Sequence, residues 1–247
     1  MKIALIGYGK MGKAIEEIAI ETGHEIILKV NKEDGDEWAN SEIKNADVAI
    51  EFTGPESAYQ NIIHCFNANV PVVCGSTGWL EKYETVKKFC TERNQAFFYT
   101  SNFSIGVNIF FELNKKLAYL MNKQPGYDEV LIHECHHLQK LDAPSGTAIT
   151  LANQIIEKVD RLDTWKNYKS DDNVTPSDNT DRELPVFSSR EGDVPGTHIV
   201  KYFSDEDEIE IIHKAFNRIG FAKGALMAAE WIRGKKGVFG MQDLLSL

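Results

Sequence analysis

The chain has 247 residues, of which 43% are hydrophobic and 26% are charged, and its formal net charge is −10. These values are ordinary for a soluble globular protein with room for one large domain or two small ones. The acidic balance disfavours a nucleic-acid partner, because such a role requires a basic surface. No run approaches the roughly 18 apolar residues that span a bilayer, so no membrane association is expected.

Four cysteines are spread along the chain, at positions 65, 74, 90 and 135, without a CxxC motif. This spacing predicts reduced, mostly buried thiols and therefore a cytoplasmic protein. The first residues, Met-Lys-Ile-Ala-Leu-Ile-Gly, lack the longer apolar region of a secretory signal. We interpret them as a buried first strand.

The N-terminal part predicts alternating strands and helices. Residues 2–6 are expected to form an apolar strand, which a glycine loop follows. Apolar residues at helical spacing then predict a helix over Lys13–Thr22, and Gly23 is expected to end it. Further strands are expected over residues 25–30, 46–52, 70–74 and 96–99, with helices over 57–68 and 80–93. This alternation indicates an α/β fold with a doubly wound, parallel, Rossmann-like sheet.

The pattern changes near residue 104. Helices are expected over residues 107–121, 147–158 and 221–232, and strands over 127–137, 185–189, 198–203 and 207–215. The polar segment 160–183 is expected to be an exposed loop. The shift indicates a second, α+β domain with a mixed or antiparallel sheet.

The loop Gly7-Tyr8-Gly9-Lys10-Met11-Gly12 follows the first strand and opens the first helix. In this context Gly-x-Gly-x-x-Gly is typical of dinucleotide binding, because it allows a tight turn, close approach of a pyrophosphate, and tight helix packing. Free N–H groups at the helix start favour phosphate. The alternative is a glycine turn without a ligand.

The residue after the second strand usually reads the adenosine ribose, and here that position is Asn31. Lys32 could meet a 2′-phosphate and Glu33 a ribose hydroxyl, so NADH and NADPH both remain open. Two further strand ends, Gly75-Ser76-Thr77 and Thr100-Ser101-Asn102-Phe103, should line the cofactor site, although such stretches can also be plain turns.

The segment Glu134–Ala148 collects His136, His137 and Lys140 just ahead of Ser145-Gly146-Thr147, where a helix is expected to begin. Histidine and lysine can deliver protons, and a helix N-terminus can receive a carboxylate. A metal site at residues 133 and 135–137 is the first rival. It is disfavoured because neighbours in a strand point to opposite faces, and because His198 and His213 look isolated.

The segment Glu-Cys-His-His-Leu-Gln-Lys-Leu-Asp-Ala-Pro-Ser-Gly-Thr-Ala closely resembles the motif of the 4-hydroxy-tetrahydrodipicolinate reductase (dihydrodipicolinate reductase) family of lysine and diaminopimelate biosynthesis. Asn102–Asn108, Arg190–His198 and Ala215–Ala225 also resemble that family, and the resemblance extends over the whole chain. Glu51 and Ser76 stand where Asp and Thr are more frequent.

The resemblance implies that His136 donates and accepts a proton and that Lys140 donates one. His137, Ser145, Gly146 and Thr147 would bind a small cyclic dicarboxylate. The change of pattern near residue 104 predicts a dinucleotide-binding domain over 1–106 and a substrate-binding and oligomerisation domain over 107–218, with a C-terminal helix, 219–247, that returns to the first domain. The resemblance further implies a homotetramer with contacts through the second domain.

The expected reaction is hydride transfer from NADH or NADPH to a cyclic imine dicarboxylate, in a cleft that closes on the substrate, without a metal. Two other functions stay open. One is another two-domain nicotinamide-dependent amino- or hydroxy-acid dehydrogenase, which would not need the histidine pair beside the helix start. The other is a nucleotide-sensing protein that has lost its chemistry.

Overall fold

The computed structural model describes residues 1–31, 34, 35, 37–40, 42–169 and 182–247. By contact density the chain divides into two compact units. One comprises Met1–Asn108 together with Arg218–Leu247, and the other is continuous, Ile109–Asn217. None of the helices in the described ranges combines the length and the apolar character needed to cross a membrane.

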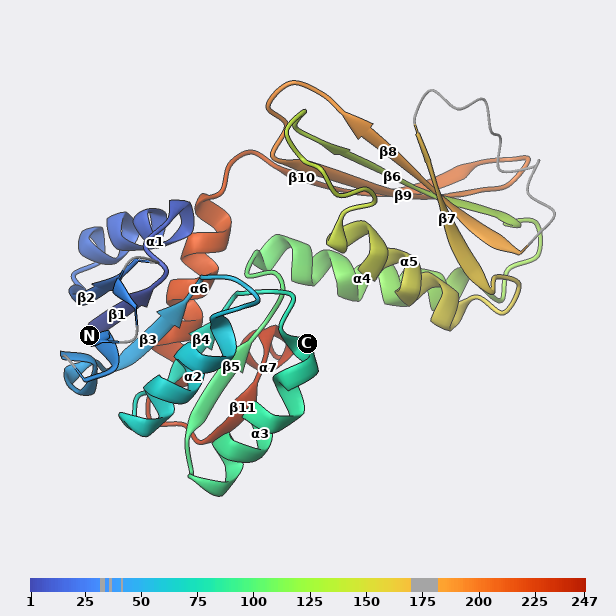
Figure 1. Ribbon diagram of the computed structural model, residues 1–247. Helices are drawn as coiled ribbons and strands as arrows, with labels where there is room; N and C mark the ends of the chain where they lie inside the picture. The colour runs from blue at the N-terminus through green and yellow to red at the C-terminus, as the bar shows by residue number, and fades with distance from the viewer. Residues whose placement is uncertain (32–33, 36, 41, 170–181) are drawn as a thin grey trace. The chain divides into compact units, whose positions relative to one another are not determined.

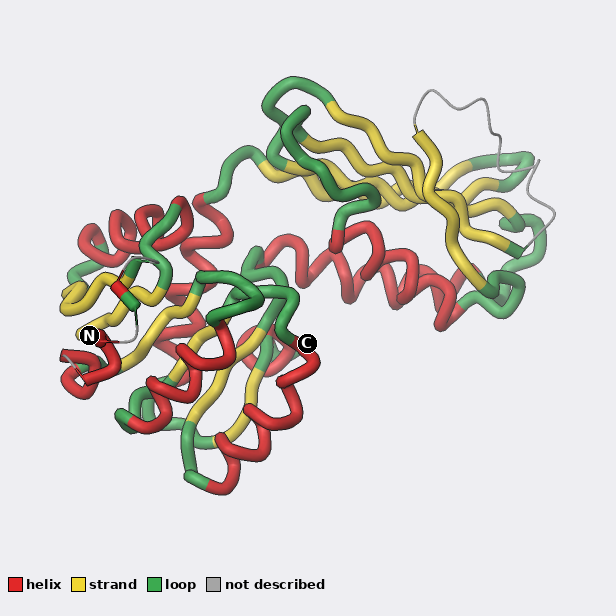
Figure 2. The backbone as a smooth tube through the Cα atoms, in the orientation of Figure 1, coloured by secondary structure: helices red, strands yellow, loops and turns green. Residues whose placement is uncertain are grey.

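The first unit is built on a six-stranded sheet whose order is β11-β5-β4-β3-β1-β2 (Figures 1 and 2). All of its recorded strand pairs are parallel. The strands are β1 (Lys2–Ile6), β2 (Glu25–Val30), β3 (Val48–Glu51), β4 (Val72–Cys74), β5 (Ala96–Tyr99) and β11 (Gly237–Phe239). Parallel strands place all their carboxyl ends along one edge.

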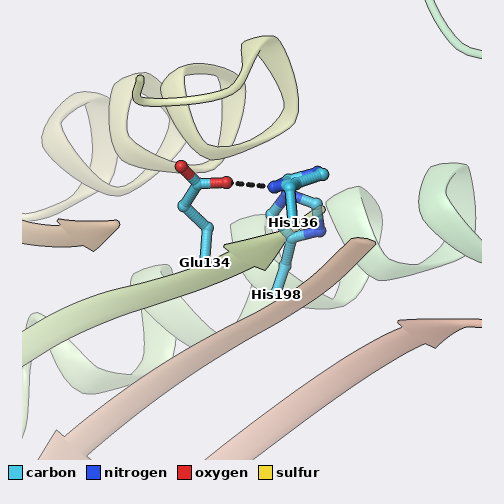
Figure 3. A group of neighbouring side chains, drawn as sticks. All are labelled: Glu134, His136 and His198. Carbon is cyan, nitrogen blue, oxygen red and sulfur yellow. Dashed lines mark ion pairs between the residues drawn. The ribbon is translucent and has the colours of Figure 1, made fainter. Parts of the chain in front are cut away.

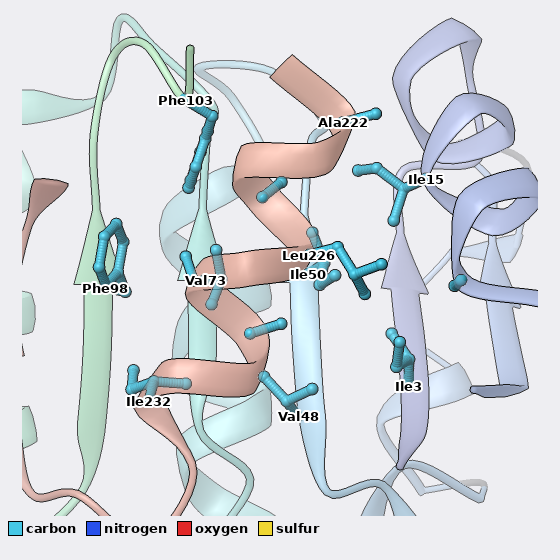
Figure 4. Packing of buried hydrophobic residues seen from close by; sticks show 14 of the residues in the cluster. Ile3, Ile15, Val48, Ile50, Val73, Phe98, Phe103, Ala222, Leu226 and Ile232 are labelled. Atoms are coloured by element: carbon cyan, nitrogen blue, oxygen red, sulfur yellow. The ribbon is translucent and has the colours of Figure 1, made fainter. Parts of the chain in front are cut away.

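Helices cover both faces of this sheet because successive strand residues point to opposite sides and both sets are apolar. On one face α1 (Lys10–Glu21) and α6 (Ile219–Ile232) pack on Ile3, Val48 and Ile50, as Figure 4 shows. On the other, α2 (Ala58–Asn67) and α3 (Tyr83–Glu92) pack on Ala4, Ala49 and Val72. Three short 3₁₀ helices, η2 (Glu37–Asn40), η3 (Glu42–Asn45) and η4 (Leu80–Lys82), lie in its connections.

The second unit holds a five-stranded sheet, β10-β9-β6-β8-β7. Its strands are β6 (Glu129–His136), β7 (Thr164–Lys169), β8 (Glu183–Arg190), β9 (Gly196–Phe203) and β10 (Glu208–Ala215). The sheet is mixed, since β6 pairs in parallel with β8 and antiparallel with β9. Helices α4 (Ile105–Met121) and α5 (Gly146–Lys158) pack on one face, where Val130, Ile132 and Tyr202 are buried (Figure 1).

The predicted α/β class, a parallel sheet followed by a mixed one, is confirmed. Three details of the prediction are wrong. Residues 164–169 form β7 rather than a loop, and residues 170–181 of that expected loop lie outside the described residues. The first helix begins at Lys10, inside the glycine loop. The C-terminal segment is not one helix, because β11 and α7 (Met241–Leu245) follow α6.

Candidate functional site

A polar cluster occupies one end of the helix-covered face of the second sheet. Along β6, Ile132, Glu134 and His136 share this face, because strand residues two apart point the same way. Ile132 belongs to the apolar core, whereas Glu134 and His136 are 2% and 7% exposed. The face therefore changes from hydrocarbon to ionisable groups where β6 ends.

Strand register brings the neighbours of Glu134 and His136 into place. Glu134 pairs with His198 on antiparallel β9, and His136 pairs with Arg190 on parallel β8. Figure 3 shows the Glu134 carboxylate against the Nδ1 atom of His136, with the ring of His198 beside it. The two imidazole centroids are 5.1 Å apart and nearly perpendicular.

Glu134 has both carboxylate oxygens engaged. Oε2 pairs with Nδ1 of His136, and Oε1 accepts a hydrogen bond of 3.0 Å from Nη1 of Arg190. Burial alone would raise the pKa of this carboxyl, but hydrogen bonds, His136 first among them, outweigh it and lower the pKa of Glu134 to about 2. A permanent carboxylate on Nδ1 leaves Nε2 as the ring atom that can exchange a proton with a ligand.

Gly196 on β9 leaves the space that the His136 ring fills. A Cβ atom added at Gly196 would lie 3.0 Å from Nε2 of His136. That distance is closer than a relaxed carbon–nitrogen contact, so a larger residue would move the ring. The open side of His136 thus depends on a glycine in the neighbouring strand.

His198 is a buried neutral histidine. Burial, followed by the nearby His136 imidazole, lowers the pKa of His198 to about 3. Its Nε2 atom lies 3.0 Å from Oγ of Ser145, and Ser145 also caps α5 by accepting a hydrogen bond from the N–H of Ala148. His198 therefore connects the histidine cluster to the helix start that was predicted to bind carboxylate.

The burial of His198 predicts a pH-dependent stability. Because its folded pKa lies below the unfolded value, the unfolded chain binds more protons below pH 6.5, and stability falls as the pH drops. Between pH 6.5 and 5 the effect of His198 should lower the free energy of unfolding by on the order of 2 kcal/mol. Urea unfolding at fixed protein concentration should show a shallower pH dependence for His198→Asn. Parallel curves for the two proteins would contradict it.

His137 and Lys140 lie in the loop between β6 and α5. Nδ1 of His137 lies 3.1 Å from Oε1 of Gln139, and Nζ of Lys140 donates to both carboxylate oxygens of Asp142 at 2.9 and 2.7 Å. The hydrogen bond from Lys140 lowers the pKa of Asp142. The lysine therefore has a carboxylate partner, Asp142.

Ser145, Gly146 and Thr147 form the first turn of α5, as expected. The N–H groups of Ala148 and Ile149 already bond to Ser145, whereas those of Gly146 and Thr147 precede the helical hydrogen-bond ladder. Gly146 is exposed and Thr147 half-buried. This helix start can receive an anion.

Glu134, His136 and His198 each offer a metal-ligand atom within 4.8 Å of the others. Of the residues weighed as a metal site from sequence, His136 alone belongs to this group, and the view of His198 as isolated is wrong. His133 is exposed and Cys135 half-buried, whereas the other three cysteines are buried, as expected of mostly buried thiols. With Glu134 bonded to both His136 and Arg190, we interpret the group as an ion-pair network.

The carboxyl edge of the first sheet carries the predicted nucleotide residues. Gly7 and Tyr8 follow β1 and donate to the carbonyl of Val30 at the end of β2, at 3.0 and 2.9 Å. Gly9 is the N-cap of α1, with Lys10, Met11 and Gly12 in its first turn. Cβ atoms at Gly7 and Gly12 would come within 2.2 Å of the Phe52 oxygen and 2.5 Å of the Gly7 oxygen, whereas Gly9 has open space.

Two other predicted loops end at the same edge. Ser76 is buried and accepts a hydrogen bond of 2.8 Å from the N–H of Thr53, and Gly75 donates to the carbonyl of Glu51. The hydroxyl of Thr100 bonds both backbone groups of Asn102. Thr77 is exposed after β4, and Ser101 is exposed after β5.

The remaining predicted nucleotide residues are Phe103, Asn31 and Lys32. The ring of Phe103 is only 2% exposed and packs in the core, so a cofactor could meet its backbone but not its ring. Asn31 is exposed after β2, with its N–H 2.6 Å from Asp34 Oδ2. Lys32 lies outside the described residues.

One pocket of about 370 Å³ adjoins the predicted loops, lined by Thr100, Tyr99, Asn108 and Gly240 among others. A larger one, of about 650 Å³, lies at η2, η3 and the end of α2, away from every predicted residue. We give more weight to the smaller pocket because it lies where parallel strands end, which is where open α/β sheets bind ligands.

Sequence reasoning assigned no role in the site to Glu134, Arg190 or His198. The signal for Glu134 was present in the sequence, because Glu134 lies two residues before His136 in the same strand and therefore points to the same side. Arg190 and His198 could be found only through strand register. Buried Glu51 was likewise passed over, although it accepts hydrogen bonds from Thr53, Asn61 and Cys74 at the nucleotide edge.

Comparison with known proteins identifies one family across both units. The family model for the N-terminus of dihydrodipicolinate reductase matches residues 1–103, and the model for its C-terminus matches residues 106–245. The 4-hydroxy-tetrahydrodipicolinate reductase of Christiangramia forsetii is 48% identical over 248 residues, covering 100% of this chain and 98% of that protein. The one from Neisseria meningitidis serogroup A is 33% identical, covering 94% and 84%.

Solved structures agree at the level of the fold. Dipicolinate-bound dihydrodipicolinate reductase from Paenisporosarcina superposes with a TM-score of 0.78 at 21% identity, covering 98% of each chain. An amine dehydrogenase from Mycobacterium smegmatis gives 0.56 at 10% identity, covering 96% of this chain and 94% of that one. Together with the two family models and the full-length relative, these observations establish that the chain belongs to the dihydrodipicolinate reductase family.

Proposed function

We propose that this protein reduces 4-hydroxy-tetrahydrodipicolinate to tetrahydrodipicolinate with NADH or NADPH, in lysine and diaminopimelate biosynthesis in the cytoplasm. The observation that carries the proposal is the 48% identity to a 4-hydroxy-tetrahydrodipicolinate reductase over the whole chain. The arrangement of His136 beside the start of α5 supports it, because it offers a proton and a carboxylate site together.

The second unit would hold the substrate. A cyclic dicarboxylate needs two anion-binding points, and the candidates are the N–H groups of Gly146 and Thr147 and the side chains of His137 and Lys140. The Paenisporosarcina relative binds dipicolinate, a planar ring with two carboxylates, which matches this donor set. A substrate carboxylate would compete with Asp142 for Nζ of Lys140.

His136 would handle the proton. The Glu134 carboxylate fixes the ring through Nδ1, so Nε2 is the atom that can donate to the position that becomes electron-rich during reduction. Lys140 is the second proton donor. Neither role requires a metal ligand from the cluster.

The first unit would bind the nucleotide through the loops at its carboxyl edge. The fit is favourable, because Gly7 and Gly12 pack too closely for any side chain while Gly9, at the N-cap of α1, is open to a pyrophosphate. When bound, the nicotinamide supplies the hydride. Gly75–Thr77 and the backbone of residues 100–103 would line the ribose and nicotinamide.

Thr147→Val should raise the KM for the dicarboxylate by about tenfold and leave kcat within about twofold. The change removes a hydroxyl beside the proposed carboxylate position and keeps the side-chain volume, and a lost hydrogen bond to a charged group costs about 1.5–3 kcal/mol. Thr150→Val, whose hydroxyl bonds the carbonyl of Gly146 instead, is the matched control. Equal KM values for wild type and Thr147→Val would argue against this carboxylate site.

The proposed activity is tested by following nicotinamide oxidation at 340 nm, with substrate made in situ by a synthase from pyruvate and aspartate semialdehyde. Rates with NADH and with NADPH give the cofactor preference. An absence of substrate-dependent oxidation with both would overturn the proposal. Oxidation with amino- or hydroxy-acid partners alone would instead assign the chain another dehydrogenase activity.

We infer a homotetramer from the open face of the second sheet. By register, Leu131, Phe187, Ile199 and Ile212 alternate away from the helix-covered core on four neighbouring strands, and of these Leu131 and Phe187 are already buried at 5% exposure each. Ile212 is 55% exposed, which suits burial against a second copy of the same face. Light scattering on the intact protein tests the fourfold mass.

A further inference from the structure

Arg190 links the two proposed proton-handling residues. It is the last residue of β8, and its side chain is 19% exposed. Nη1 donates to the Glu134 carboxylate at 3.0 Å, the same carboxylate that holds His136. Nε and Nη2 donate to the carbonyls of Lys140 and Asp142 at 3.3 and 2.6 Å. One guanidinium thus contacts both the carboxylate that holds His136 and the loop that carries Lys140.

These contacts use the guanidinium in a way that lysine could not reproduce. Nη1 also donates to the carbonyl of Ser189 at 2.6 Å, so three nitrogens reach four acceptors in fixed, coplanar directions. A lysine presents one nitrogen and can serve part of this set. Backbone hydrogen bonds alone hold the loop between β6 and α5 at fewer points, among them the bond from the N–H of Leu138 to the carbonyl of Gly192.

We propose that Arg190 is a positioning residue that fixes the Lys140 loop relative to His136, and that its loss lowers the rate of reduction rather than the affinity for nucleotide. This inference rests on the proposed function of His136 and Lys140. Displacing a reacting group by about 1 Å can cost roughly 10²-fold in rate, so a residue that sets this spacing affects kcat even without touching substrate.

The experiment compares Arg190→Ala and Arg190→Lys with the same changes at Arg182. Arg182 is a suitable control because it lies in the same unit and also bonds a carboxylate, Asp163, and a carbonyl, that of Asp160. The measurements are kcat, KM, nucleotide affinity and thermal unfolding.

Arg190→Ala should lower kcat by about 10- to 100-fold, change nucleotide affinity less than twofold, and regain at least about threefold in rate with added guanidinium ion. Arg190→Lys should recover part of the rate. The Arg182 variants should have the wild-type kcat, and added guanidinium ion should not change it.

Wild-type kcat in Arg190→Ala and Arg190→Lys, with an active wild-type enzyme, would overturn this inference alone. So would a kcat loss that merely follows a loss of folded protein and is not rescued. If Arg190→Ala fails to fold, Arg190→Lys decides on the same criteria. An inactive wild type would refute the proposed function instead.

Discussion

Turnover of the His136→Gln variant should fall by about 10²-fold or more, while its affinity for nucleotide should stay close to that of the wild type. Glutamine keeps a polar group near the Glu134 carboxylate but cannot exchange a proton at Nε2. The nucleotide loops belong to the other compact unit, so the substitution should leave them intact.

Steady-state kinetics and a fluorescence titration with NADH or NADPH separate the two effects. His24→Gln provides the control, because that histidine pairs with exposed Glu230 at the surface of the first unit. Near-wild-type turnover in His136→Gln would remove His136 from the mechanism. A parallel loss in His24→Gln would mean that the effect is not specific.

Replacing Gly7 and Gly9 one at a time should lower stability in the first case and nucleotide affinity in the second. At Gly7, φ is +98° and an added Cβ would lie 2.2 Å from the backbone oxygen of Phe52. Strain and overpacking of this kind each cost about 1–3 kcal/mol, so Gly7→Ala should lower the free energy of unfolding by roughly 2–6 kcal/mol. Urea unfolding measures this change.

Gly9→Ala should behave in the opposite way. Its φ is −86° and nothing lies within 4 Å of an added Cβ, so stability should change by less than about 1 kcal/mol. The methyl group would, however, occupy the approach of a pyrophosphate to the start of α1, and nucleotide affinity should fall about tenfold or more. Unchanged affinity in a folded Gly9→Ala protein would place the pyrophosphate elsewhere.

Most of the first unit could be predicted because its strands are short apolar runs separated by helical patterns. The elements that were missed are short or polar. β7, Thr-Trp-Lys-Asn-Tyr-Lys, lies at the sheet edge with β8 as its one paired neighbour, and most of its side chains are partly solvated. β11 has three residues and forms by pairing with β5, a contact that the local sequence does not encode.

The site divides in the same way. His136, Ser145 and the start of α5 lie close in the chain, and a motif can indicate them together. Glu134 is bonded to Arg190, which lies 56 positions later, and Ser145 to His198, 53 positions later. Such pairings depend on which strands become neighbours and in what register, and the periodicity of single segments contains neither.

The return of α6 to the first sheet has a consequence for the order of folding during synthesis. Ala222, Leu226 and Ile232 complete a core that begins with Ile3, so the part of that sheet face not covered by α1 stays open until the ribosome has added residues 109–232 (Figure 4). At about 5–20 residues per second this delay is on the order of ten seconds. The continuous middle unit, Ile109–Asn217, has all its residues earlier. The part of the protein that is made first therefore closes its core last.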